Sequence, residues 1–405
     1  MKRFIVLTQF AAITAIYIFL NGCSNSTSVR RPPHFVAVNA THAHYIHSQS
    51  PRNIALLLPQ SGSLAPYASA IRNGFFTAYY YEKNHSSIAP TIAVYNTAGK
   101  NIQDVVQTAI KQGADFVVGP LDKSDVMQLA NTKASVVPIL ALNTTPSAQR
   151  IDNDLLFEFG LSPTDEAQQA AMRAQQDHHK NVVILAPNSV FGQRLVNAFT
   201  QEWTRLGGTV VATQYYGSVA TLSKNVATVL QINNAYQNER ELKNMFRENM
   251  RFIPQRRNDF DSIFLVASPG AAQQIQPLLQ FYFAGNIPIY ATSQIYPSIS
   301  VGGNNDLNGI IFCDMPWVLA PNQMPAYQRN IQQRIQSLWP DNYNHFAKFY
   351  AMGVDAFYLT LQLKQMQSQM GVSGATGTLY LTPQHYVYRQ LVWAQFQNGQ
   401  PQLIR

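Results

Sequence analysis

The sequence predicts an α/β protein of two consecutive lobes, each built on a parallel sheet flanked by helices. Residues 54–58 form an uninterrupted apolar run, as expected of a strand buried on both faces. A Pro-Gln-Ser-Gly-Ser turn follows, and apolar residues then recur at helical spacing from Tyr67 to Tyr79. The same strand, turn and helix pattern starts again at residue 182. Repetition of this unit predicts two lobes of similar plan.

Each further apolar run in the first lobe ends in small or turn-forming residues and precedes a helical pattern. The expected strands are 54–58, 91–95, 116–118, 136–142 and 155–159. Helices are expected at 102–111 and 122–131, the second capped by Asp122 or Ser124. Asp165 and Glu166 open the next helix, where acidic residues suit the helix dipole.

The second lobe repeats the alternation. Its expected strands are 182–185, 209–215, 261–267, 287–292 and 309–313. Its expected helices are 191–206 and 271–283, and residues 218–258 are polar and helical in character. A helix at 346–370 and a strand at 391–396 are expected to return and complete both lobes. The lobes would then be joined by several crossings, with the cleft between them as the natural ligand site.

The N-terminus is typical of a bacterial lipoprotein. Lys2 and Arg3 precede an apolar segment, residues 4–20, and Gly22 stands before Cys23 as in a lipobox. A transmembrane anchor is the alternative, although the run is marginal for spanning a bilayer. We expect Cys23 to carry lipid, and Ser24 after it resembles lipoproteins sent to the outer membrane.

These observations predict the following organisation: signal peptide 1–22, lipidated Cys23 with a tether to residue 52, first lobe 53–162, second lobe 163–318, and a segment 319–405 that completes both lobes. The tether is rich in Ser, Asn, Pro and His and would reach roughly 100 Å when extended. Its histidines lack a carboxylate or thiol at usable spacing, so a solvated linker is favoured over a metal site; they are His34, His42, His44 and His47.

Composition excludes several classes of protein. Only 12% of residues are charged and 46% are hydrophobic, which indicates a globular, exported chain. The net charge is +8, but the basic residues are scattered and form no aromatic-interleaved stripe, so nucleic acid is not an expected partner. With Cys23 lipidated, Cys313 is alone and is expected to be a buried small hydrophobe.

Small hydroxyl, amide, glycine and proline residues follow each strand of the first lobe. Backbone amides and hydroxyls at strand ends beside helix starts can hold a carboxylate or a polar solute. The same residues are also ordinary turn formers and caps, and both interpretations stay open at this point. The candidate ligand residues are Ser61, Gly62, Ser63, Asn96, Thr97, Gly119, Pro120, Asn143, Thr144, Ser162 and Thr164.

Catalytic signatures are absent from the sequence: it contains no Ser-x-x-Lys, Gly-x-Ser-x-Gly, His-Glu-x-x-His or phosphate-loop motif. We therefore expect no catalytic residue, metal or cofactor. Two aromatic stretches are expected to pack: residues 281–283 between a helix and its sheet, and Trp317 near a strand end, where an exposed recognition role is the alternative.

Several segments together resemble the LppC family, the LpoA-type lipoprotein activators of penicillin-binding proteins. They span residues 54–319 in the family's order, and a weaker match, MGVDAFYL and GATGTLYL, extends to residue 381. The most specific are IALLLPQSGSLAPYASAIRNGFFTAYY, GADFVVGPLDKSDV, FEFGLSPTDEAQQAA, VVILAPNSVFGQRL, DSIFLVASPGAAQQIQPLLQFYFAGNIPIYATSQIY and DLNGIIFCDMPWVL.

The resemblance implies a type I periplasmic-binding-protein fold, lipid attachment at Cys23 to the outer membrane, and a non-enzymatic role. That role is to contact a class A penicillin-binding protein and stimulate its peptidoglycan synthesis. Enterobacterial members carry a large helical, TPR-like domain before the binding-protein module, whereas only the short tether is expected here. A solute-binding or sensing lipoprotein that holds a small polar ligand in the cleft is the alternative function.

Overall fold

The computed structural model describes residues 50–85, 89–132, 135–145, 153–246, 255–296, 304–366 and 370–405. The chain divides into two units, residues 1–37 and 38–405, and all described residues belong to the second unit. The predicted signal peptide, Cys23 and nearly all of the tether lie outside the described residues.

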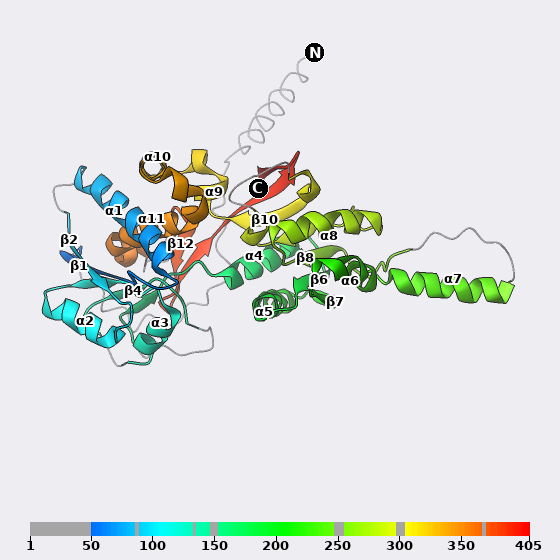
Figure 1. The fold of residues 1–405 in the computed structure, drawn as a ribbon, viewed down its shortest axis with the longest axis horizontal. Coiled ribbons are helices and arrows are strands. Elements are labelled where there is room, and N and C mark those ends of the chain that lie inside the picture. The colour runs from blue at the N-terminus through cyan, green and yellow to red at the C-terminus, as the bar shows by residue number, and fades with distance from the viewer. Residues whose placement is uncertain are drawn as a thin grey trace, which may run out of the picture. The chain divides into compact units, whose positions relative to one another are not determined.

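The first sheet has five strands in the order β2-β1-β3-β4-β5, and every pair is parallel. Residues 54–58 are almost fully buried because both faces of the sheet are covered. Helices α1 and α11 cover one face, while α2 and α3 cover the other (Figure 1). The strands are β1 (Asn53–Leu58), β2 (Thr91–Asn96), β3 (Phe116–Val118), β4 (Ile139–Ala141) and β5 (Leu156–Glu158).

Local sequence explains where the helices of this lobe begin. The side chain of Asn101 accepts backbone N–H groups at the start of α2, and that of Asp122 does so at the start of α3, as predicted. The helices are α1 (Ala65–Lys83), α2 (Ile102–Lys111) and α3 (Lys123–Ala130).

The second sheet has seven strands in the order β15-β14-β10-β9-β8-β6-β7. The pairs from β10 to β7 are parallel, whereas β14 and β15 join antiparallel at the other end. The strands are β6 (Asn181–Pro187), β7 (Thr209–Tyr216), β8 (Ser262–Leu265), β9 (Ile289–Ala291), β10 (Ile310–Asp314), β14 (Val392–Gln397) and β15 (Gln400–Ile404).

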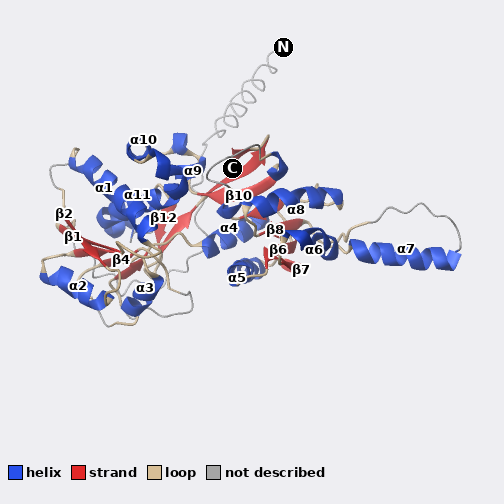
Figure 2. Ribbon diagram, in the orientation of Figure 1, coloured by secondary structure: helices blue, strands red, loops and turns tan. Residues whose placement is uncertain are grey.

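Helices α4 and α5 cover one face of this sheet, and α6 and α8 cover the other (Figure 2). Trp203 and Phe199 are buried between the sheet and helices α4 and α5, and Phe199 stacks on Phe264 with ring centroids 4.0 Å apart. The helices are α4 (Pro163–Gln176), α5 (Val190–Arg205), α6 (Leu222–Val229), α7 (Ile232–Phe246) and α8 (Pro269–Phe281).

The chain after β10 returns to the first lobe before it ends in the second sheet. Helix α11 packs along α1, and a small antiparallel sheet, β11-β12-β13, adjoins β5 through a bridge between Glu158 and Tyr386. The remaining elements are α9 (Pro316–Leu319), α10 (Ala326–Leu338), α11 (Pro340–Met366), β11 (Val372–Ser373), β12 (Thr378–Leu381) and β13 (Val387–Gln390), with short 3₁₀ turns at 219–221, 293–295, 305–307 and 321–323.

The chain therefore crosses between the two large sheets at three places: between β5 and α4, between β10 and α9, and between β13 and β14. The division into segments at residues 162/163 and 318/319 remains a proposal.

The structure corrects two predictions about the helices. Phe281 and Phe283 are 72% and 53% exposed, so residues 281–283 do not all pack on the sheet; Tyr282 alone lies against the core, because α8 ends there and the chain turns outward. Helix α11 begins at Pro340 rather than Phe346, and Phe346 marks a kink within it. Trp317 is buried, which confirms the packing interpretation.

Within the described part of the chain, no helix has both the length and the apolar character needed to cross a bilayer.

Candidate functional site

The loops after β1, β2 and β3 meet at the carboxyl edge of the first sheet and line an open hollow of about 440 Å³. All of its lining residues come from the first lobe, and we call it the strand-end hollow. It is lined by Pro59, Ser61, Gly62, Ser63, Leu64, Thr97, Ala98, Gly99, Lys100, Asp122, Ser124 and Asp125.

The hollow offers hydroxyl groups and charges of both signs. Ser61 and Ser63 are exposed, while Thr97 is buried. The hydrogen bond from Ser124 lowers the pKa of Asp122, whereas burial and the neighbouring Asp122 raise the pKa of Asp125. Helix α1 starts at this edge without a side-chain cap, so its first N–H groups have no side-chain acceptor. A small polar solute suits this chemistry.

Asn96, Gly119 and Pro120 lie at the same edge but shape the turns. The Asn96 carboxamide oxygen accepts the N–H groups of Gln60 at 2.9 Å and Ala98 at 3.0 Å. Gly119 has a φ of +103°, and a Cβ there would lie 2.1 Å from the carbonyl oxygen of Leu57. Pro120 is buried after a cis bond. These residues fit the turn-forming interpretation.

Asn143 and Thr144 follow β4 and do not line the hollow. The Asn143 Nδ2 group donates to the Leu121 carbonyl at 3.0 Å, and its Oδ1 accepts the Thr144 N–H. Ser162 caps α4 through Oγ, which also lies 2.7 Å from the Thr164 hydroxyl. Of the predicted ligand residues, the structure thus gathers Ser61, Gly62, Ser63 and Thr97 in one hollow.

A second polar region lies at the three crossings and is largely buried. Lys348 of α11 places Nζ 2.8 Å from Asp314 Oδ2 and donates to the Ser293 hydroxyl at 2.8 Å. Ser293 in turn donates its N–H and its hydroxyl to the Glu166 carboxylate at 2.9 and 3.1 Å. A chain of bonds therefore runs from α11 through the ends of β9 and β10 to α4.

The first and third crossings are tied in the same way. The Tyr386 hydroxyl donates to the Asp165 carboxylate, and Arg389 Nε donates to the Gly160 carbonyl at 3.0 Å. Gln169 of α4 donates to the Arg389 carbonyl and accepts the Leu391 N–H, both at 2.9 Å. We call the whole set the crossing network: Asp165, Glu166, Gln169, Ser293, Asp314, Lys348, Tyr386 and Arg389.

Burial controls the ionisation of this network. Burial raises the pKa of Glu166, and Lys348 opposes that shift. Burial likewise raises the pKa of Asp165 against the hydrogen bond from Tyr386 and the charge of Arg389. Cys313 is free and buried beside Glu166, and burial raises the pKa of its thiol, so it is a poor nucleophile.

The sequence does not predict this network. Asp165 and Glu166 were expected at a helix start for the helix dipole, yet both are buried and bonded to residues of other elements. The sequence does offer one signal for it, an isolated carboxylate in an apolar setting, as Asp314 is after the run 310–312.

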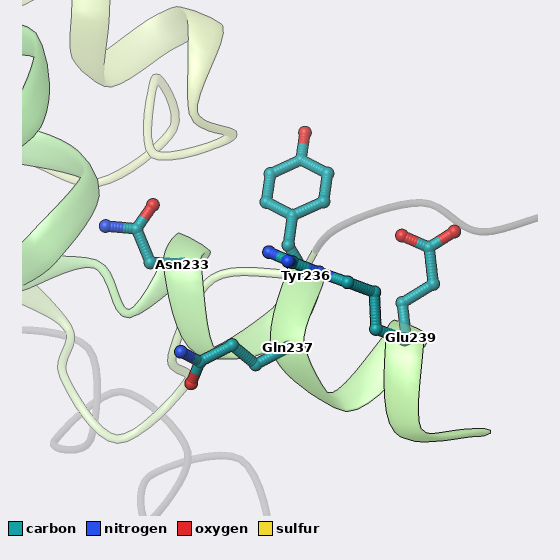
Figure 3. A pocket seen from close by; sticks show the side chains of 5 residues that line it. Asn233, Tyr236, Gln237 and Glu239 are labelled. Carbon is teal, nitrogen blue, oxygen red and sulfur yellow. The ribbon is translucent and has the colours of Figure 1, made fainter. Parts of the chain in front are cut away.

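A second hollow, of about 460 Å³, is lined by residues of α7 alone. Figure 3 shows the side chains of Asn233, Tyr236, Gln237 and Glu239 pointing in different directions from this single helix. One helix cannot enclose a solute, so this surface is not a candidate ligand site. Among the described residues, no group of His, Cys, Asp and Glu is arranged to hold a metal ion.

Comparison with known proteins agrees with this architecture. The family model "LppC putative lipoprotein" matches residues 35–399. The chain belongs to the LppC family. The Vibrio antiquarius protein "Penicillin-binding protein activator LpoA" is 32% identical over 356 residues, which are 85% of this chain and 57% of that relative. The chain thus spans just over half the length of the curated relatives it matches.

Solved structures of similar proteins establish the fold class of this LppC chain. The "LpoA (YraM) C-domain from Haemophilus influenzae, a regulator of PBP1A" matches with a TM-score of 0.66 and 26% identity, over 87% of this chain and 100% of that domain. A "putative branched-chain amino acid ABC transporter" from Rhodospirillum rubrum matches with a TM-score of 0.65 over 87% of this chain and 99% of that one; at 14% identity this speaks to the fold alone. The predicted type I periplasmic-binding-protein-like fold is confirmed.

Proposed function

We propose that this chain is a lipid-anchored, non-enzymatic activator that binds a class A penicillin-binding protein and stimulates its peptidoglycan synthesis. The observation that carries the proposal is the match of this chain to the whole length of the Haemophilus LpoA C-domain, whose description names it a regulator of PBP1A. The Vibrio relative, named as a penicillin-binding protein activator, supports the same role.

The mechanism we propose is allosteric. An activator that binds the active arrangement of a synthase more tightly than the inactive one shifts the synthase toward the active arrangement. The chain would supply binding free energy and no reacting group. The bonding of its buried carboxylates to structural partners accords with this role.

We propose that lipid on Cys23 holds the protein at the periplasmic face of the outer membrane. The tether, with a reach of roughly 100 Å, would let the folded module approach a synthase in the inner membrane. A Cys23→Ser variant should leave the membrane fraction while residues 50–405 keep their fold.

The test is peptidoglycan synthesis by the organism's own purified class A penicillin-binding protein, with and without residues 24–405. This part contains every described residue, and the Haemophilus C-domain was solved as a separate chain. We expect glycan-strand and cross-link production to rise and to saturate with added protein. Unchanged synthesis together with no binding would overturn the proposal.

The strand-end hollow favours a second candidate function, the binding of a small polar solute. Its hydroxyl groups, Lys100 and the start of α1 lie where proteins with open α/β sheets bind ligands. Native mass spectrometry of the protein purified from its own periplasm tests this candidate. A stoichiometric bound solute that is lost in a Ser61→Ala, Ser63→Ala double variant would support it, and unliganded protein alone would count against it.

A further inference from the structure

The contacts at the crossings bear on whether the two lobes move. Binding proteins that close on a solute do so by bending a hinge, which requires that few contacts oppose the motion. In this chain, Lys348 belongs to α11, which packs along α1 in the first lobe. Its two partners, Asp314 and Ser293, belong to the second lobe and lie 2.8 Å from Nζ.

Separating these groups would be costly because of their burial. The Asp314 side chain is 2% exposed and Glu166 is 7% exposed, whereas the Lys348 side chain is 25% exposed. A bend that withdrew Lys348 would leave the buried Asp314 carboxylate without its ion-pair partner, and it would remove a positive charge that favours the ionised form of Glu166. Leaving a buried charge unpaired is strongly unfavourable.

Independent bonds tie the other crossings. The Tyr386 hydroxyl, from the small sheet that adjoins β5, reaches Asp165 on α4. Gln169 on α4 holds the backbone at the third crossing, through the Arg389 carbonyl near the end of β13 and the N–H of Leu391, which links β13 to β14. A hinge motion must therefore break bonds at more than one crossing together.

We propose that Glu166, Ser293, Asp314 and Lys348 form an interlobe lock that holds the two lobes at one fixed angle. The module is then a single rigid body that offers surfaces of both lobes to a partner, and it does not close on a solute as a clamshell. This inference is independent of whether the chain binds a synthase.

The test is the distance between spin labels on residues 24–405. Labels are placed at Gln107→Cys on α2 and Gln201→Cys on α5, both exposed positions, while Cys313 is buried and escapes labelling. Double electron–electron resonance should give one narrow distance distribution for the locked protein. A broad or two-peaked distribution would overturn the proposal.

Lys348→Met should release the lock and add a second distance population, from below roughly 5% to above roughly 50% of molecules. The matched control is Lys111→Met, an exposed lysine on α2, which should leave the narrow distribution unchanged. A folded Lys348→Met protein with the narrow distribution intact would contradict the lock. If Lys348→Met does not fold, Lys348→Gln decides, because it keeps a polar side chain that can donate hydrogen bonds but loses the charge. A broadened distribution supports the lock, and an unchanged one overturns it.

Discussion

The strand-end hollow and the crossing network use similar polar residues in opposite ways. In the hollow, the side chains of Ser61 and Ser63 are exposed. In the network, Glu166 and Asp314 are buried and bonded across the crossings. This difference shows that residue type alone does not distinguish a ligand-binding side chain from a structural one. The burial of the side chain and its hydrogen-bond partners make that distinction. Removal of a buried polar side chain from the network should therefore cost stability, and removal of the exposed Ser61 and Ser63 hydroxyls should cost little.

The largest effect is expected from Arg389→Met. Arg389 is 1% exposed and donates to the Gly160 carbonyl, and its positive charge opposes the rise that burial causes in the pKa of Asp165 and Glu166. Its removal takes a buried positive charge from the network and leaves the Gly160 carbonyl without this donor, which should lower the free energy of unfolding by about 3–5 kcal/mol. Urea denaturation measures this.

The matched control is Arg205→Met on the surface of α5, where Arg205 is 57% exposed and pairs with Glu202. Because exposed ion pairs contribute little, we expect a change within about 0.5 kcal/mol. Equal effects of the two arginine variants would refute the contrast between buried network and surface.

Two glycines at the carboxyl edge of the first sheet allow a crowded position to be compared with an open one. Gly119→Ala should cost about 3 kcal/mol because its Cβ would meet the Leu57 carbonyl and its φ is positive. Gly62 also has a positive φ, of +84°, but has no neighbour within 4 Å of the added Cβ. Gly62→Ala should therefore cost only about 1 kcal/mol. Thermal unfolding of both variants checks the ranking, and the reverse order would show that Gly119 is not a structural residue.

The dependence of the unfolding free energy on pH tests the burial of Asp355, a carboxyl group close to the crossing network. Burial raises the pKa of Asp355 from 3.8 to about 6, against hydrogen bonds from Thr376 and Ala375. The protonated form is thus favoured in the folded state. This contribution to stability is fully present below about pH 4 and is lost as the pH rises through about 6, on the order of 3 kcal/mol in all.

Asp355→Asn should flatten this part of the curve of unfolding free energy against pH, relative to the parent protein. Asp341→Asn, at an exposed position in the first turn of α11, is the control and should leave the slope unchanged. A parent slope that persists in Asp355→Asn would assign the titration to another group.

The smallest effect on stability is expected from the Ser61→Ala, Ser63→Ala double variant. Both side chains are exposed, so the free energy of unfolding should change by no more than about 0.5 kcal/mol. A loss above about 1 kcal/mol would mean that these hydroxyls support the turn after β1.

The first sheet was predictable because its information is local. The apolar run 54–58 predicted β1, which is confirmed, and of the two predicted caps of α3, Asp122 or Ser124, the structure shows Asp122. The crossing network was not predictable, because Glu166 and Ser293 are 127 residues apart and Asp165 and Tyr386 are 221 apart. No spacing rule in one sequence joins such pairs. The exposure of Phe281 and Phe283 depends likewise on where α8 ends against its neighbours.

The most direct test of the account is to titrate the organism's class A penicillin-binding protein with residues 24–405 and with the Ser61→Ala, Ser63→Ala form of the same protein. We predict the same saturable rise in glycan-strand synthesis for both, because a protein partner, rather than a solute in the strand-end hollow, carries the function. No rise and no binding with either form would contradict the account. A rise with the parent alone would assign the activating site to the hollow.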